Sequence, residues 1–302
     1  MPIYDPERDI PDLTGKTIFI TGGTGGLGAA SALHLAKHNP EHIYISGRNA
    51  AAAKAIIQQI HETNSITSVT FIQCDLASLT SVSQAATTFI AQPQVQKLDI
   101  LICNAGIMAH TPALTTDGYE IQFGTNHLGH ALLIKKLLPL LTASPDPRTV
   151  LLTSQGWALH PSGGIIFPDL RTTQSFPFGG PWRRYGQSKL ANLIWARELA
   201  RRVPGLTAVS VHPGVVGTGL FHGLGLKDKL LIYATAWWKF VSVQEGAWNQ
   251  VWAATVDKKE VVNGGYYEPV GRLKDGRLDG DARDEGLGER LWNWTEEALE
   301  GL

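Results

Sequence analysis

The chain has 302 residues, of which 43% are hydrophobic and 18% charged, and its formal net charge is −1. This balance is typical of a globular protein and gives no electrostatic reason to expect nucleic acid or an anionic membrane as a partner. The N-terminal residues lack the basic start and apolar core of a signal peptide, and no uncharged apolar run approaches the ~18 residues that cross a bilayer. We therefore expect a cytoplasmic protein that binds no nucleic acid and makes no membrane contact.

Short apolar runs alternate with helix-length segments along most of the chain. The runs are continuously apolar, which is expected for strands that helices cover on both faces. Helices between successive strands indicate one α/β domain over residues 1–302, with a doubly wound parallel sheet of about seven strands. The predicted strands are 16–21, 42–46, 68–74, 98–103, 148–154, 206–212 and 264–269, and the predicted helices are 27–38, 50–62, 78–91, 117–141 and 184–202.

A glycine-rich turn, TGGTGGLG (21–28), follows the first predicted strand and opens the first helix. Such a turn lets the backbone approach a pyrophosphate at the helix N-terminus, where free N–H groups favour anions. Gly22, Gly26 and Gly28 fit one known spacing, and Gly22, Gly25 and Gly28 fit another. The loop alone leaves the two registers open, and a glycine-rich turn without a ligand is the alternative to both.

The second strand ends in ISGRNA (45–50) and carries no carboxylate at the position where one would bind the adenosine ribose hydroxyls. Arg48 stands there instead, and a guanidinium suits a 2′-phosphate well. The sequence therefore favours NADP(H) over NAD(H) as the cofactor. An exposed arginine with no ligand is the alternative.

Both cysteines, Cys74 and Cys103, close apolar runs. A small free cysteine behaves as a buried hydrophobe, so we expect buried strand ends rather than a disulfide or a metal pair. Asp75 follows directly and has two compatible readings, a contact with the adenosine part of a cofactor or a cap for the helix that starts near Ser78.

Two irregular segments, 155–183 and 213–242, follow predicted strands and should border the ligand at the carboxyl edge of the sheet. Their aromatic density fits a lipophilic or aromatic small-molecule ligand, and packing of the loops onto the domain is the alternative. Residues 230–240 of the second segment are hydrophobic, and the alternative to a role beside the ligand is that they contact a membrane surface or a partner chain. The large side chains are Trp157, Phe167, Phe176, Phe178, Trp182, Leu220, Phe221, Leu224, Trp237 and Trp238.

Tyr185 precedes Lys189 by four residues, which places the two side chains on one helix face about one turn apart. The pair alone decides nothing. Together with TGGTGGLG, CDL (74–76), CNAG (103–106), NHLGH (126–130), Ser154 and HPGVVGT (212–218), however, it resembles the short-chain dehydrogenase/reductase family over nearly the whole chain. NHLGHALL and YGQSKLANLIWARELARR resemble most closely the single-domain, retinol-dehydrogenase-like branch.

The resemblance implies a Rossmann fold and selects the register of Gly22, Gly26 and Gly28. It implies that Tyr185 is the general acid/base and that Lys189 lowers the pKa of its phenol and binds the nicotinamide ribose. Ser154, rather than its neighbour Thr153, would hold the substrate oxygen, and Asn126 would hold a water in a proton relay. Cys103 departs from the family, which often has asparagine there, and one polar contact beside the loop is lost.

The same resemblance implies an NADPH-dependent oxidoreductase that interconverts a ketone or aldehyde and an alcohol, and the aromatic segments then favour a lipophilic or aromatic carbonyl substrate. A non-catalytic dinucleotide sensor or scaffold, and an epimerase or dehydratase, are the alternatives. A homodimer paired through 117–141 and 184–202 is raised by analogy only. We expect no metal, because His127, His130 and His212 form no ligand cluster. The implied cofactor contacts are Gly22, Thr24, Gly26, Leu27, Gly28, Arg48, Asp75, Leu76, Asn104, Ala105, Gly106, Tyr185, Lys189, Pro213, Gly214, Val215 and Thr218.

Overall fold

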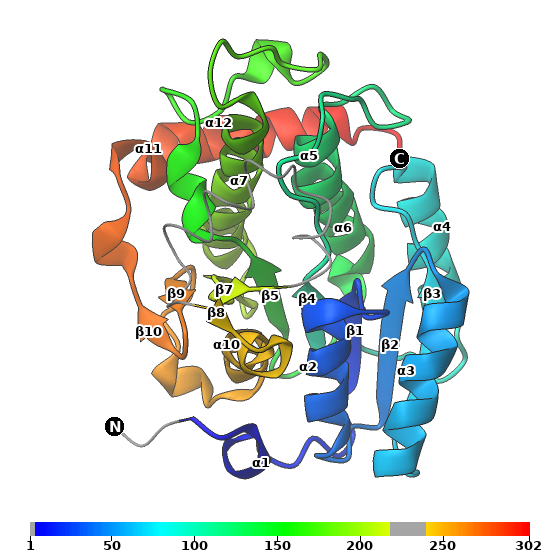
Figure 1. Ribbon diagram of the computed structural model, residues 1–302. Helices are drawn as coiled ribbons and strands as arrows, with labels where there is room; N and C mark the ends of the chain where they lie inside the picture. Colours follow the sequence, from blue (N-terminus) through cyan, green and yellow to red (C-terminus); the bar gives the residue numbers. More distant parts are fainter. Residues whose placement is uncertain (1–3, 218–239) are drawn as a thin grey trace.

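The computed structural model describes residues 4–217 and 240–302, and its centre is an eight-stranded sheet in the order β10-β9-β6-β5-β4-β1-β2-β3 (Figure 1). All neighbours pair in parallel except the short edge strand β10, which runs antiparallel to β9. The doubly wound parallel sheet predicted from the sequence is confirmed. The strands are β1 Thr17–Thr21, β2 His42–Gly47, β3 Ser68–Gln73, β4 Ile100–Cys103, β5 Arg148–Leu152, β6 Thr207–Val211, β9 Tyr266–Glu268 and β10 Arg272–Leu273.

Alternate residues of each central strand enter two different cores. Ile18 and Ile20 of β1 pack in one apolar cluster, whereas Phe19 packs in the other, and all three side chains are fully buried. Helices α2, α3 and α10 cover the first face, and α4, α6 and α7 cover the second. The two covered faces explain why the strands read as unbroken apolar runs. The helices are α1 Pro6–Asp9, α2 Gly26–Ala36, α3 Ala50–Thr63, α4 Leu79–Ile90, α5 Ile121–Phe123, α6 Gly129–Thr142, α7 Gly180–Arg202, α10 Val243–Thr255, α11 Gly280–Arg283 and α12 Glu285–Ala298.

The helix predicted over 117–141 is interrupted. Glu120 caps α5, because its carboxylate accepts the N–H groups of Gln122 and Phe123. A π-helical turn, Gly124–Leu128, then separates α5 from α6. Such turns are frequent at functional sites. The helix predicted from 184 begins four residues earlier in α7, with Pro181 in its first turn, where a missing N–H costs nothing.

Two long helices, α10 and α12, were not predicted. Helix α12 crosses α7 and α5 (Figure 1). Trp292 of α12 stacks on Trp195 of α7 with ring centroids 4.5 Å apart, and Glu296 forms an ion pair with Lys135 of α6. Helix α10 lies on the opposite face against α2. Short strands β7 Val215–Val216 and β8 Phe240–Val241, which pair in parallel, border the part of 213–242 that lies outside the described residues.

Candidate active site

The glycine loop between β1 and α2 leaves almost no room for side chains. Gly22 and Gly26 adopt φ values of +67° and +52°, the left-handed region that favours glycine. A Cβ at Gly28 would lie 2.3 Å from the carbonyl oxygen of Gly22. Gly25, by contrast, has an extended φ of −176°, and a Cβ there would meet no described atom within 4 Å. The backbone thus requires glycine at 22, 26 and 28, the register that the resemblance selects.

A cavity of about 590 Å³ extends from this loop along the carboxyl edge of the sheet to Tyr185. Most of the implied cofactor contacts line it. Arg48 lies at its wall with an exposed side chain, and unpredicted lining residues include Thr21, Ile107 and His110. The predicted residues in the lining are Gly22, Thr24, Gly26, Leu27, Arg48, Asp75, Leu76, Asn104, Ala105, Gly106, Tyr185, Lys189 and Pro213.

The remaining predicted contacts lie outside that lining. Gly28 packs beneath the glycine loop, Gly214 precedes β7, and Val215 is the first residue of β7. Thr218 lies outside the described residues. Asp75 accepts a hydrogen bond from the N–H of Ala77, but Ser78 is the N-cap of α4, so the cap considered for Asp75 belongs to Ser78.

Thr21 joins the glycine loop to the loop after β4. Its carbonyl accepts from Asn104 Nδ2 at 2.8 Å, and its Oγ1 accepts from the N–H of Ala105 at 3.0 Å. His130 Nδ1 lies 2.9 Å from the Asn126 carbonyl, which only accepts, so Nδ1 carries the hydrogen and Nε2 accepts from Thr21 at 2.8 Å. Burial lowers the pKa of His130 to about 4, which is consistent with a neutral ring.

Tyr185 and Ser154 meet at the end of β5. Burial raises the pKa of Tyr185 to about 12, and a hydrogen bond with Ser154 acts in the opposite direction. Ser154 Oγ also accepts from the N–H of Gly156, whereas Thr153 Oγ1 donates to the carbonyl of Lys189 at 2.7 Å. The two adjacent hydroxyls therefore have separate roles, and it is Ser154 that reaches the tyrosine.

Lys189 lies beneath Tyr185 on α7. Its Nζ is 5.8 Å from the centre of the Tyr185 ring and donates to the Leu152 carbonyl at 3.0 Å. Burial lowers the pKa of Lys189 to about 8. A Cβ at Gly106 would lie 3.4 Å from the same Nζ, so the glycine leaves the ammonium open toward the cavity.

Asn126 lies in the π-helical turn and is fully buried. Its Oδ1 accepts from the N–H of Ile107 at 2.8 Å, and its Nδ2 donates to the Ile107 carbonyl and to Ser188 Oγ. The side chain thus holds the loop after β4 against α7.

The aromatic residues of 155–183 divide into two groups. Trp157 and Phe167 are buried in the core, where Trp157 packs on Tyr266 and Phe167 on Trp294. Trp182 contacts Tyr185 edge to face, and Phe178 is 83% exposed. Packing thus accounts for part of this set. Leu220, Phe221, Leu224, Trp237 and Trp238 lie outside the described residues, as does most of 230–240.

The sequence analysis missed a polar link from α10. Gln250 is fully buried, and its Nε2 donates to the Leu27 carbonyl, Ser31 Oγ and Asn104 Oδ1. It thus connects α10 to both loops that border the cavity. A signal was present, because Ser242 and Glu245 form a capping box, a spacing that marks a helix start.

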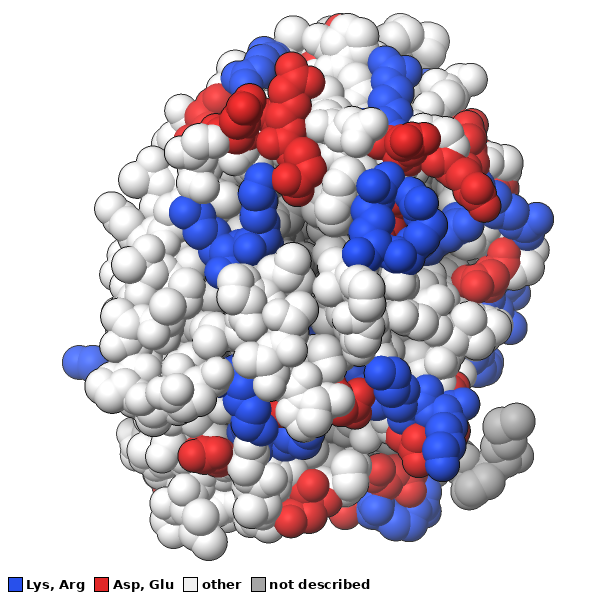
Figure 2. Space-filling model, turned by 180° about the vertical axis from the view of Figure 1, so that it is seen from behind, with Lys and Arg blue, Asp and Glu red and all other residues white. Residues whose placement is uncertain are grey.

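The other predicted groups are placed as follows. Cys74 and Cys103 are buried and free at their strand ends, as predicted. Among the described residues, no group of three or more His, Cys, Asp or Glu could hold a metal ion, and no helix is long and apolar enough to cross a membrane. On the face shown in Figure 2, basic and acidic side chains lie beside one another. Cytoplasmic location, the lack of nucleic-acid and membrane contact, and a homodimer stay predictions.

The cavity fits a dinucleotide. Gly22 and Gly28 let the loop pack closely on itself and on Asn104, because a Cβ at Gly28 would lie 2.3 Å from the Gly22 carbonyl oxygen and one at Gly22 would lie 3.0 Å from Asn104 Nδ2. Such a tight turn leaves backbone N–H groups at the start of α2 free for a pyrophosphate. The polar groups of Asn104, Lys189 and Tyr185 follow along the same cavity, and Arg48 lies at its wall.

Known proteins resemble this chain over almost its full length. Residues 16–165 match the model of the short-chain dehydrogenase family. An uncharacterized oxidoreductase of Schizosaccharomyces pombe is 37% identical over 98% of this chain and 88% of its own. Human retinol dehydrogenase 14 is 35% identical over 93% of this chain and 85% of its own. The crystal structure of a metagenomic blue fluorescent protein in complex with NADPH superposes with a TM-score of 0.66, at 26% identity over 86% of this chain and 98% of that one.

Proposed function

We propose that this chain, which belongs to the short-chain dehydrogenase family of nicotinamide-dependent oxidoreductases, interconverts a lipophilic ketone or aldehyde and its alcohol with NADP(H). The observation that carries the proposal is the meeting of Ser154, Tyr185 and Lys189 beside a glycine-cradled cavity. A protein that only sensed a dinucleotide would have no need of all three side chains.

In this proposal Tyr185 gives its phenolic proton to the carbonyl oxygen during reduction and recovers it during oxidation. Ser154 donates a hydrogen bond to the same oxygen. When bound, the dinucleotide supplies or accepts the hydride. Burial holds the phenol pKa near 12, so the Lys189 ammonium is required to favour the phenolate at working pH. Because the pKa of Lys189 is about 8, the ammonium predominates at neutral pH.

Asn126 is proposed as part of the proton relay from Lys189. Its Oδ1 lies 2.9 Å from the position of a Cβ at Gly106, and Lys189 Nζ lies 3.4 Å from the same position. The two groups therefore flank one small space beside the cavity. A water in that space would link the lysine to the loop after β4.

The preference for NADP(H) is proposed on Arg48, whose exposed guanidinium lies at the cavity wall after β2. A 2′-phosphate accepts two parallel hydrogen bonds from such a group. The solved relative in complex with NADPH is consistent with this preference. A lipophilic substrate is proposed from the edge-to-face contact of Trp182 with Tyr185 and from the retinol dehydrogenase among the relatives.

The test of the reaction is oxidation of NADPH, followed by absorbance, with retinal and an aromatic ketone as probes. Tyr185→Phe should lower kcat by about 10³-fold, because no group then supplies the proton, and should leave the Kd for NADPH almost unchanged. Tyr44→Phe, a buried phenol beside Gln94, is the matched control. Full activity of Tyr185→Phe would remove the acid/base assignment. Turnover without net loss of NADPH would favour an epimerase or dehydratase, and binding without turnover would favour a sensor.

The test of the cofactor is titration with NADPH and NADH, followed by tryptophan quenching. Arg48→Ala should weaken NADPH binding by about 10- to 100-fold, since hydrogen bonds to charged groups contribute ~1.5–3 kcal/mol, and should change NADH binding little. Arg272→Ala, an exposed arginine on β10, is the control. Equal affinity of the unmodified protein for both dinucleotides would exclude this role of Arg48.

A further inference from the structure

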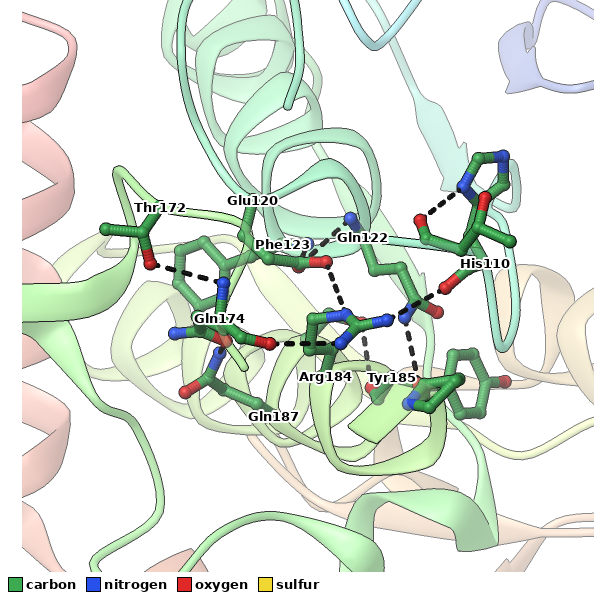
Figure 3. Close-up of polar contacts among 12 residues, drawn as sticks. His110, Glu120, Gln122, Phe123, Thr172, Gln174, Arg184, Tyr185 and Gln187 are labelled. Atoms are coloured by element: carbon green, nitrogen blue, oxygen red, sulfur yellow. Dashed lines mark hydrogen bonds and ion pairs between the residues drawn. The ribbon is translucent and has the colours of Figure 1, made fainter. Parts of the chain in front are cut away.

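Arg184 immediately precedes Tyr185 on α7, yet its side chain is buried, with 2% of its area exposed. A buried arginine needs a compensating charge and partners for its N–H groups. Figure 3 shows the guanidinium between Glu120, Gln174 and His110. We name these four residues the Arg184 cluster.

The contacts of the Arg184 cluster come from three separate parts of the chain. Arg184 Nε forms an ion pair with Glu120 Oε1 at 3.2 Å. Its Nη1 donates to the Gln174 carbonyl at 3.0 Å, and its Nη2 donates to the His110 carbonyl at 3.0 Å. One planar side chain therefore connects the loop after β4, the start of α5 and the segment before α7.

Two of these parts border the candidate site, and the sequence predicts that the third does. Ile107 and His110 line the cavity together with Tyr185. Gln174 belongs to 155–183, which the sequence predicts to border the substrate. Glu120 caps α5, which leads directly into the π-helical turn that carries Asn126.

The surroundings of Gln174 show how firmly this arrangement is held. Gln174 adopts a φ of +47°, which is uncommon outside glycine. Its N–H donates to Thr172 Oγ1, its Oε1 accepts from Gln187 Nε2, and its carbonyl is the one that Arg184 holds (Figure 3). Strained backbone of this kind persists where the surroundings over-determine it, and it concentrates at functional sites.

We propose that Arg184 is a positioning residue for the carbonyl-reducing site. It fixes the loop 107–110 and the segment 172–179 relative to Tyr185, so that the space beside the phenol keeps one width for the substrate. This inference rests on the proposed function for its kinetic consequence. Its structural part, the fixing of two segments by one side chain, does not.

The charge of the pair allows positioning to be separated from folding. Removing one partner of a buried ion pair leaves the other uncompensated, whereas neutralising both removes most of that destabilisation. Arg184→Met and Glu120→Gln each break the pair, and the double variant neutralises it. In the double variant the introduced amide oxygen can still accept the N–H groups that Glu120 caps, but the carbonyls of His110 and Gln174 have lost their donor.

The first experiment measures thermal midpoint, kcat and KM of the single and double variants with NADPH and retinal. We expect the double variant to regain much of the midpoint lost by Arg184→Met while kcat/KM stays about 10- to 100-fold below that of the unmodified protein, because misplaced groups near the reacting atoms cost such factors. Arg201→Met, an exposed arginine on α7, is the control. Recovery of kcat/KM together with the midpoint would overturn the proposal.

The second experiment measures amide hydrogen exchange of the NADPH complex and requires no turnover. We expect exchange in 107–111 and 172–179 to be at least about tenfold faster in the double variant, since both segments lose an anchor, while 21–28 is unchanged. Unchanged exchange in both segments would overturn the proposal. If the unmodified protein reduced no carbonyl compound, the proposed function would fail, and the exchange result would still decide whether Arg184 fixes the two segments.

Discussion

The glycine loop and the Arg184 cluster border the same cavity and are built in opposite ways. The glycine loop depends on residues without a side chain, because a Cβ added at Gly28 would lie 2.3 Å from the carbonyl oxygen of Gly22. At the Arg184 cluster, one large side chain connects three separate segments. The first region depends on local backbone conformation and the second on long-range hydrogen bonds. Changes at the loop should therefore affect cofactor binding, and changes around Tyr185 should affect turnover.

Lys189→Met tests the prediction that changes around Tyr185 affect turnover, and the largest loss of kcat among these variants is expected for it. The Leu152 carbonyl keeps a donor in Asn192 Nδ2 at 3.0 Å, so the fold should persist. Without the ammonium the phenolate is less favoured, and kcat should fall by about 10²–10³-fold. Alcohol oxidation needs the phenolate, so its rate rises with pH, and a higher phenol pKa should move this rise to higher pH. The pH–rate profile with NADP⁺ measures the shift. Lys54→Met, which removes an exposed lysine, is the control and should leave the profile unchanged. An unshifted profile for Lys189→Met would contradict the role of Lys189.

At the glycine loop, a matched pair of alanine variants tests the opposite consequence. Gly28→Ala should weaken NADPH binding by about 100-fold or more, because the loop must move to admit the methyl group. Gly25→Ala should change the Kd by less than about twofold, because its backbone is extended and the added methyl meets no described atom. The Kd from tryptophan quenching measures both. Equal losses would show that the register of Gly22, Gly26 and Gly28 does not govern binding.

The smallest effect is expected for Gln250→Ala. Gln250 joins α10 to the glycine loop and to the loop after β4. Losing hydrogen bonds to Leu27, Ser31 and Asn104 should lower the free energy of unfolding by about 1–2 kcal/mol and raise the Kd for NADPH about fivefold. Urea unfolding and NADPH titration measure these changes. Gln244→Ala, an exposed residue of the same helix, is the control. A Kd unaffected by the loss of Gln250 would mean that the loops hold their places without α10.

The same contrast explains what could be predicted from the sequence. The strands and the glycine loop could be predicted because each depends on residues that are contiguous in the chain. Apolar runs and glycine spacing reflect local backbone constraints. The Arg184 cluster could not be predicted in this way, because Glu120 and Arg184 are far apart in the chain and neither belongs to a motif. The break in the helix predicted over 117–141 was missed for a different reason. The cap of Glu120 and the π-helical turn are local, but neither changes the apolar periodicity from which the helix was predicted.

Helix α12 has a consequence for assembly. Its Trp292 stacks on Trp195 of α7, and its Glu296 forms an ion pair with Lys135 of α6. Thr295 Oγ1 lies 3.1 Å from His127 Nε2. These contacts occupy part of the surface through which two copies paired by α6 and α7 would meet. A second copy would compete there with a segment tethered to the same chain, whose effective concentration does not fall on dilution. The shielding of this aromatic surface is therefore built into each molecule and is independent of how many molecules surround it.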